Sequence, residues 1–110
     1  MIEVGHGVSI RENELRESFL RASGPGGQNV NKLETAVQLR FDARNSPSLP
    51  EPVRARLLRM AGHRATGAGE VVITAQRFRT RERNREDALE RLLALIREAA
   101  APPPPKRRAT

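Results

Sequence analysis

A glycine-rich stretch contains the residues of this chain that are best suited to chemistry. Gly24, Pro25, Gly26 and Gly27 stand in a row, and Gln28 follows them. Glycine has no Cβ and reaches positive φ without strain, so backbone N–H groups of such a stretch can approach a developing oxyanion or a leaving oxygen. The Gln28 amide does not titrate near neutral pH, so it can orient or exclude water but cannot act as a general base. Such a loop could hydrolyse only an activated bond, with its other catalytic groups supplied by a partner.

The spacing of these glycines excludes the common phosphate-binding loops. A dinucleotide fingerprint that starts at Gly24 would need its third glycine at Asn29, and a P-loop needs Ser or Thr directly after a lysine, which Lys32 lacks. His6 and His63 are far apart and have no patterned carboxylates nearby, so we expect no metal and no other cofactor. The alternative is a flexible connection whose asparagines serve as turn residues. The residues alone leave both interpretations of the loop open.

The charge of the chain indicates a polyanionic partner. Lys and Arg number 20 against 13 acidic residues, which gives a net charge of +7, and only Lys32 and Lys106 are lysines. Arginine pairs bidentately with phosphate, so this choice favours nucleic acid over a generic anionic surface. A GC-rich genome would also favour Arg over Lys, but codon usage does not account for the excess of positive charge.

Composition also limits the compartment and the domain count. The 110 residues suit one domain and include no cysteine, which excludes disulfides, thiolate metal sites and a cysteine nucleophile and is typical of a reducing compartment. We expect neither a membrane span nor a signal peptide, because no apolar run is long enough. The protein should therefore act in the compartment in which it is made.

Alternating apolar residues predict strands. Val37, Leu39 and Phe41 alternate with polar residues from Thr35 onward, which is typical of a half-buried strand. The other elements expected outside the long helices are a weak strand over residues 8–10, one or two helical turns near residues 12–16, an extended segment over residues 18–23 and a strand over residues 70–74.

Two segments have helical spacing. The first should begin at the capping-box pattern Ser48 to Glu51 and end at Gly62, with its apolar side formed by Val53, Leu57, Leu58 and Ala61. The second has an i,i+4 pair, Asp87 and Arg91, on the side opposite an apolar stripe of Ala88, Leu89, Leu92, Leu93, Ile96 and Ala99. We expect a compact single α+β domain, with a small mixed or antiparallel sheet packed by two helices.

The last ten residues cannot fold by themselves. Residues 102–105 are four prolines, and the basic residues Lys106, Arg107 and Arg108 follow them. Prolines favour a stiff, extended spacer. We therefore expect a domain over residues 1–100, and a linker or the start of a disordered basic tail over residues 101–110.

The glycine segment also resembles a known motif. From Arg21 to Asn31 the chain follows the pattern R-x-S-G-x-G-G-Q-x-V-N, which resembles the GGQ motif of class I peptide-chain release factors, and the likeness extends over roughly residues 8–100. The resemblance implies hydrolysis of the ester between a nascent peptide and tRNA in the peptidyl transferase centre of the ribosome. It makes Gly26, Gly27 and Gln28 the catalytic residues of a protruding loop. The residues that would support that loop are Arg21, Ser23, Gly24, Pro25, Val30 and Asn31.

One small domain cannot touch both a stop codon and the peptidyl transferase centre. The chain is therefore similar to the single-domain ribosome-rescue members of that family, peptidyl-tRNA hydrolases of the ArfB or YaeJ type, which implies codon-independent action of a monomer on stalled ribosomes. In those proteins a long basic tail enters the mRNA channel of the small subunit, whereas only three basic residues close this sequence. Either the natural protein continues beyond Thr110, which we favour, or it senses stalling differently. We expect a bacterial cytoplasm, with an organellar matrix as the alternative.

Arginines occupy every second position from residue 77 to residue 85, so an extended backbone would place them on one face. The resemblance implies that this face contacts ribosomal RNA. The full set of expected rRNA-binding residues is Lys32, Arg77, Arg79, Arg81, Arg83, Arg85, Lys106, Arg107 and Arg108. The alternatives are a solvated charge run at a helix start and, for the protein as a whole, a non-catalytic basic module that binds ribosomes or RNA.

Overall fold

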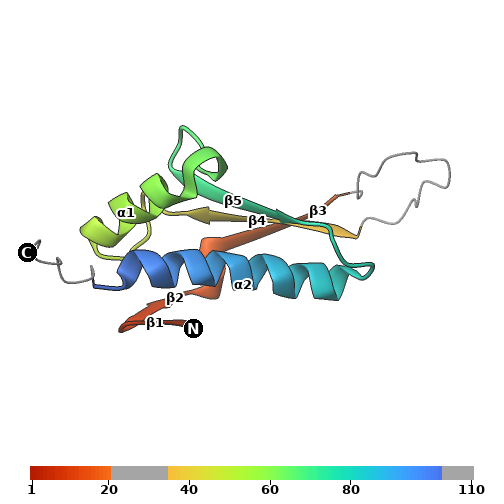
Figure 1. The fold of residues 1–110 in the computed structure, drawn as a ribbon, viewed down its shortest axis with the longest axis horizontal. Coiled ribbons are helices and arrows are strands. Elements are labelled where there is room, and N and C mark those ends of the chain that lie inside the picture. Colours follow the sequence, from red (N-terminus) through yellow and green to blue (C-terminus); the bar gives the residue numbers. More distant parts are fainter. Residues whose placement is uncertain (21–34, 103–110) are drawn as a thin grey trace, which may run out of the picture.

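Two antiparallel sheets and two long helices make up the described part of the chain (Figure 1). The computed structural model describes residues 1–20 and 35–102. Its elements, in chain order, are β1 (Ile2–Gly5), β2 (Val8–Ile10), the 3-10 turn η1 (Glu12–Glu14), β3 (Leu15–Leu20), β4 (Ala36–Asp42), α1 (Glu51–Ala61), the 3-10 turn η2 (Gly62–Arg64), β5 (Glu70–Ala75) and α2 (Arg81–Ala100). The expected α+β domain with an antiparallel sheet and two helices is confirmed.

The larger sheet has three strands in the order β3-β4-β5, with β4 in the centre. Val37, Leu39 and Phe41 of β4 are buried while Gln38 and Arg40 between them are partly exposed, so the predicted half-buried strand is confirmed. The period of two places every second side chain on the core face. β3 is an edge strand and is mostly exposed. It pairs with β4 in regular register up to the last pair, Leu20 with Ala36.

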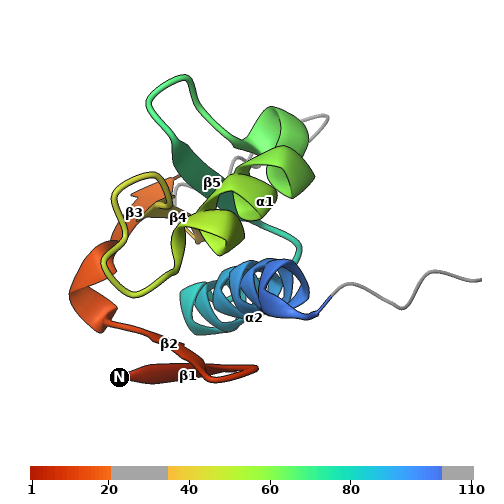
Figure 2. The ribbon, with the colours of Figure 1, turned by 90° about the vertical axis from the view of Figure 1, so that its left-hand side faces the viewer.

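Helix α2 lies across the sheet and fills the centre of the core. Leu92 and Ile96 are fully buried and pack in one cluster with Phe41 of β4 and Leu57 of α1. Figure 2 shows α2 between the β1–β2 hairpin on one side and the sheet with α1 on the other. Because α2 has neighbours on both sides, its buried surface is wider than the apolar stripe alone. The prediction that Asp87 lies opposite that stripe is wrong, since its side chain is buried.

Helix α1 ends where the sequence predicts, but it begins two residues later than a helix capped by Ser48 would. The predicted capping box is wrong: Pro50 is the N-cap residue, and no side chain caps the helix. The Ser48 hydroxyl instead donates a hydrogen bond to the carboxylate of Glu14, 34 residues earlier in the chain. The helix ends at Gly62, whose φ of 58° is in the region that favours glycine.

The N-terminal strand β1 was not predicted. A turn with positive φ at Gly5, His6 and Gly7 joins it to β2, so the apolar alternation is interrupted after only four residues. A tertiary contact supports the hairpin, because Nε of Arg97 in α2 donates to the carbonyl of Val4 over 2.8 Å. The helical turn expected near residues 12–16 is shorter than predicted: η1 spans three residues, and the extended segment begins at Leu15 rather than at residue 18.

Candidate functional site

The predicted catalytic residues belong to the segment between β3 and β4. Residues 21–34 and 103–110 lie outside the described residues, and with them Gly26, Gly27, Gln28, all the loop-support residues, Lys32, Lys106, Arg107 and Arg108. The structure does fix the two strands that carry the segment. β3 ends at Leu20, β4 begins at its pairing partner Ala36, and α2 begins at the same end of the molecule (Figure 1).

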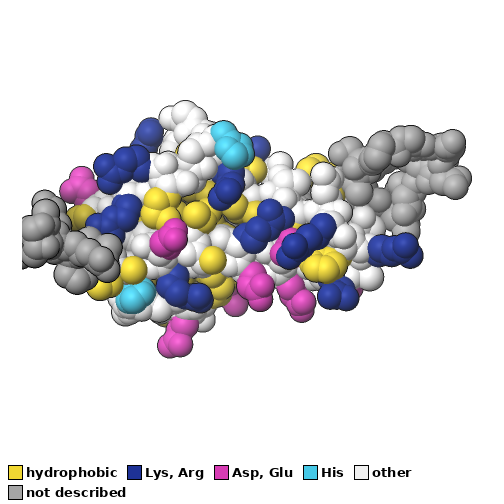
Figure 3. Space-filling view, viewed as in Figure 1, with side chains coloured by type: hydrophobic (Ala, Val, Ile, Leu, Met, Phe, Trp, Pro, Cys, Tyr) yellow, Lys and Arg dark blue, Asp and Glu magenta, His cyan; other side chains and the backbone are white. Residues whose placement is uncertain are grey.

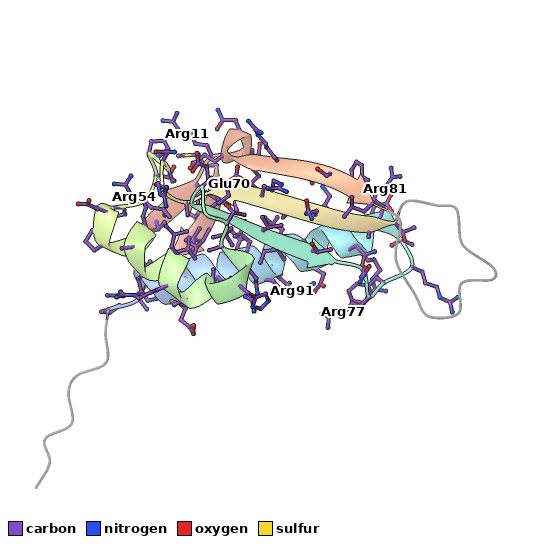
Figure 4. All side chains as sticks on the ribbon, turned by 90° about the horizontal axis from the view of Figure 1, so that it is seen from above. Arg11, Arg54, Glu70, Arg77, Arg81 and Arg91 are labelled. Carbon is purple, nitrogen blue, oxygen red and sulfur yellow. The ribbon has the colours of Figure 1, made fainter. Side chains whose placement is uncertain are left out.

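We call this region the loop-bearing end and define it as residues 17–20, 35–38 and 76–87. The exposed fractions of Phe19 and Leu20 here are 38% and 37%, which is high for large apolar residues. The guanidinium of Arg81 lies over the Phe19 ring, 4.3 Å from its centroid. Figure 4 shows Arg77 and Arg81 at this end, whereas Arg91 lies farther along α2. Apolar and basic groups therefore meet at the root of the glycine segment.

The arginine run does not form one extended ribbon, because the backbone bends at residues 77–80 and the alternative of a helix start holds from Arg81 onward. Thr80 is the N-cap of α2: its hydroxyl accepts a hydrogen bond from the backbone N–H of Arg83, and the helix begins at Arg81. On a helix, residues four apart share a side and residues two apart do not. Arg81 and Arg85 therefore lie on one side of α2, and Arg83 lies on another.

Two of these arginines flank a single aromatic ring. The guanidinium of Arg77 lies 5.0 Å from the centroid of the Phe78 ring, and that of Arg83 lies 4.5 Å from it. Arg77 also pairs with the buried carboxylate of Asp87 over 2.7 Å, and Arg91 approaches the other oxygen of this carboxylate to 3.1 Å. A stacked guanidinium keeps its N–H edges available for hydrogen bonds. The protein thus fixes the orientation of these cations before any partner binds.

The other two predicted arginines of this run differ from each other. Arg85 pairs with Glu17 of β3 over 2.5 Å, so it joins the start of α2 to the edge strand. Arg79 lies in the connection between β5 and α2 and is exposed. Figure 3 shows Lys and Arg side chains distributed along one face of the molecule, including the loop-bearing end. The structure therefore brings the predicted arginines to one end, although on more than one side of it.

Asn84 is a fully buried amide at the loop-bearing end and was not predicted as a site residue. Its Nδ2 donates to the carbonyls of Thr35 and Phe78, and its Oδ1 accepts from the backbone N–H of Phe78. The sequence did contain a signal for this burial. Residues four apart share one side of a helix, and steps of four back from Ile96 lead through Leu92 to Asn84 on the buried stripe of α2. A polar residue on the core side of a helix needs hydrogen-bond partners, so it marks a specific contact.

Within residues 1–20 and 35–102, the loop-bearing end carries small open grooves. One of about 370 Å³ includes Glu17 and Arg85 in its lining, and one of about 200 Å³ is lined by Arg77, Phe78, Arg83, Glu86, Asp87 and Glu90. An open groove of about 720 Å³ lies between η2, β5 and α2, and the residues that line it include none of the loop-bearing end. Within the same ranges no three His, Cys, Asp or Glu side chains gather as a metal site would require. None of the helices described is both long and apolar enough to cross a membrane. The described part of the loop-bearing end is thus an open surface with shallow grooves.

These features define a domain of the release-factor class, and comparison with known proteins agrees. The RF-1 domain model matches residues 2–110, so the chain belongs to the RF-1 domain family. It is 46% identical to the peptidyl-tRNA hydrolase ArfB of Pseudomonas putida over 110 residues, which are 100% of this chain and 79% of that protein. The resemblance stated from the glycine motif is confirmed.

Two further relatives show how widely this domain is used. The mouse large ribosomal subunit protein mL62 is 35% identical over 88 residues, 80% of this chain and 43% of that protein. Peptide chain release factor 2 of Thermomicrobium roseum is 34% identical over 98 residues, 89% of this chain and 20% of that protein. The region similar to this chain therefore makes up most of the Pseudomonas putida ArfB protein but only a fifth of release factor 2.

Proposed function

We propose that this protein hydrolyses the ester between a nascent peptide and tRNA on stalled ribosomes, without reading a codon. The observation that carries the proposal is the intact motif from Arg21 to Asn31 in a chain that is similar, over its full length, to a protein named peptidyl-tRNA hydrolase. The rival function, a basic module that binds RNA without catalysis, does not require two adjacent glycines before Gln28.

The chemistry would come from the backbone of the motif. Gly26 and Gly27 would allow the main chain to approach the ester, and the N–H of Gln28 would stabilise the transition state or the departing hydroxyl. The Gln28 side chain would shape the site of the attacking water. The base of the loop would be supported by Arg21, Ser23, Gly24, Pro25, Val30 and Asn31. The ribosome and the terminal adenosine of the tRNA would supply the remaining groups.

The partners follow from charge and size. The arginines of the loop-bearing end and Lys32 would contact large-subunit rRNA, with orientations set by Phe19 and Phe78. Residues 1–100 would form the catalytic domain, and residues 101–110 would form a linker whose basic residues start a tail for the mRNA channel of the small subunit. The protein would act as a monomer in a bacterial cytoplasm, or in an organellar matrix. This domain by itself is too small to reach both the codon and the ester.

A peptide-release assay tests the proposal. Ribosomes carrying a labelled nascent peptide on mRNA without a stop codon are mixed with this chain, with and without an added basic extension. We expect release by the wild-type chain and a loss of at least about 10²-fold for Gly27→Ala, with ribosome binding nearly unchanged, because the added Cβ strains the tip without altering charge.

Gln28→Ala serves as a graded comparison in the same assay. We expect a smaller loss of release activity than for Gly27→Ala, because the orientation of the attacking water tolerates more change than the backbone conformation of the loop tip does. Release by Gly27→Ala at the wild-type rate would contradict the backbone mechanism. Binding without any release by the wild-type chain carrying the basic extension would favour the non-catalytic module instead.

A further inference from the structure

We propose that Asn84 is a positioning residue for peptide release: it fixes the C-terminal root of the glycine segment against α2 and thereby sets the rate of release rather than the affinity for the ribosome. The inference rests on the proposed function. It concerns Thr35, the first described residue after the segment, and the connection between β5 and α2 around Phe78.

Three hydrogen bonds meet at this amide. Nδ2 of Asn84 donates to the Thr35 carbonyl over 2.7 Å and to the Phe78 carbonyl over 3.0 Å. Oδ1 accepts from the Phe78 N–H over 2.9 Å. Both amide protons and the amide oxygen are therefore used, and the side chain is inaccessible to solvent. The contact to Thr35 spans 49 residues of sequence, so it joins two parts of the fold that no local structure would bring together.

Thr35 depends on this contact because of its position in the sheet. The ladder between β3 and β4 ends at the pair Leu20 and Ala36, so Thr35 lies one residue beyond the last paired position. A strand end without further pairing frays readily. Asn84 extends the fixed part of the chain by one residue toward Gln28 and ties it to the rigid start of α2. The opposite root needs no such bond at Leu20, because this residue is itself in the ladder.

The chemistry of the site accepts few other side chains. Aspartate has the same size, but it would place an oxygen against the carbonyl oxygens of Thr35 and Phe78. Serine is too short to serve three partners, and glutamine adds a methylene to a fully buried position. Rate should respond strongly to such a change, because a displacement of about 1 Å at a site that must meet a reacting centre can cost about 10²-fold. Ribosome affinity should respond weakly, because no charge that faces the RNA is altered.

The test separates positioning from simple loss of stability. Full-length wild type, Asn84→Asp, Asn84→Ser and the control Ile96→Ala are compared in single-turnover peptide release at saturating protein, well below each melting temperature. Ile96 is buried in the same helix three turns from Asn84 and lies outside the loop-bearing end, so its truncation lowers stability without touching the root. Amide hydrogen exchange at Ala36 and Val37 is measured on the same proteins.

We expect Asn84→Asp to slow release at saturation by about tenfold or more, with the half-saturating concentration changed by less than about twofold. Asn84→Ser should be intermediate, and it serves as the second variant where the aspartate protein fails to fold. Ile96→Ala should release at a rate within about twofold of wild type. Exchange at Ala36 and Val37, the first paired residues of β4, should accelerate in the Asn84 variants and not in the control.

Two outcomes would overturn the inference. One is wild-type release by Asn84→Ser or Asn84→Asp, and the other is an equal slowing by Ile96→Ala at matched stability. Failure of the proposed function looks different, because the wild-type chain itself would then release no peptide. In that case hydrogen exchange still decides whether Asn84 fixes the root: unchanged exchange at Ala36 and Val37 in the Asn84 variants would refute that as well.

Discussion

The two ends of the β3–β4 hairpin are each closed by one polar side chain, but the two side chains have different chemistry. At the loop-bearing end, the neutral amide of Asn84 bonds to backbone groups of Thr35 and Phe78. At the far end, the carboxylate of Glu14 accepts the hydroxyls of Ser46 and Ser48, each over 2.5 Å, and the backbone N–H of Arg11 over 2.8 Å.

The two networks should respond differently to acid. An amide does not titrate, so the contacts of Asn84 persist at any pH at which the protein is folded. Burial is the largest single influence on Glu14 and raises its pKa, but the hydrogen bonds from Ser46, Ser48 and Arg11, together with the Arg11 charge, lower the pKa below its ordinary value of 4.5. The hydrogen bonds of Asn84 are thus insensitive to pH, whereas those of Glu14 are sensitive to it.

Removal of the amide should have the largest effect on stability. Asn84→Ala leaves two carbonyls and one N–H without their partner, so we expect the free energy of unfolding to fall by about 2 to 4 kcal/mol. Partial access of water to Thr35, which is half-buried, keeps the loss below the sum of three buried groups. Urea denaturation with a fixed m-value measures the change. A midpoint equal to that of the wild type would mean that the amide contributes nothing to the fold.

Loss of charge at the far end should matter less to stability and should not affect peptide release. Glu14→Gln keeps the size of the side chain but weakens the bonds from two hydroxyls, so we expect a cost of about 1 to 2 kcal/mol at pH 7. Denaturation and the release assay are run on the same protein. A drop in release as large as that of Asn84→Ser would remove the functional difference between the two ends.

Acid should erase the difference between wild type and Glu14→Gln. The folded pKa of Glu14 is lowered, so its contribution is fully present above 4.5 and declines as the pH falls through the folded pKa. The free energies of unfolding of the two proteins should therefore converge below pH 4.5. The gap between wild type and Asn84→Ala should stay constant over the same range. Parallel curves for wild type and Glu14→Gln down to the acid limit would contradict the assignment.

The smallest effect on stability is expected at the ion pair of the loop-bearing end. The side chain of Arg85 is 59% exposed in its pair with Glu17, so Arg85→Ala should cost less than about 1 kcal/mol. Ribosome affinity should nevertheless fall at low salt, because one of the cations proposed to contact rRNA phosphates is lost. Titration with labelled ribosomes at two salt concentrations measures this. Equal affinity at low salt would remove Arg85 from the RNA-binding set.

Local pattern predicted the regular elements well and failed at positions with distant partners. The alternation in β4 follows from the side-chain period and the C-terminal end of α1 follows from Gly62, and both signals act within a few residues. Ser48 has the spacing of a helix cap, yet its hydroxyl bonds to Glu14, because the fold brings the end of η1 beside it. β1 was not predicted either. Its four residues are too few for a periodic signal, and its partner Arg97 is near the other end of the chain.

The run from Arg77 to Arg85 shows the limit most clearly. Alternation in the sequence suggested one extended face, but Thr80 caps a helix that begins at Arg81 and turns the later arginines to different sides. The number of positive charges could be counted from the sequence, whereas the side on which each arginine lies depended on where the helix starts. The same holds for Asp87, whose i,i+4 pair with Arg91 was predicted and whose burial was not.

By itself, the sequence determined the motif from Arg21 to Asn31, the excess of positive charge and the periodicity of the main strand and helices, because each depends on residues that are neighbours along the chain. Only the tertiary structure decided which polar side chains close the two ends of the hairpin. The bonds of Asn84 to Thr35 and of Glu14 to Ser46 span 49 and 32 residues. A hydrogen bond needs its two atoms within about 3 Å, and only folding brings positions so distant along the chain that close.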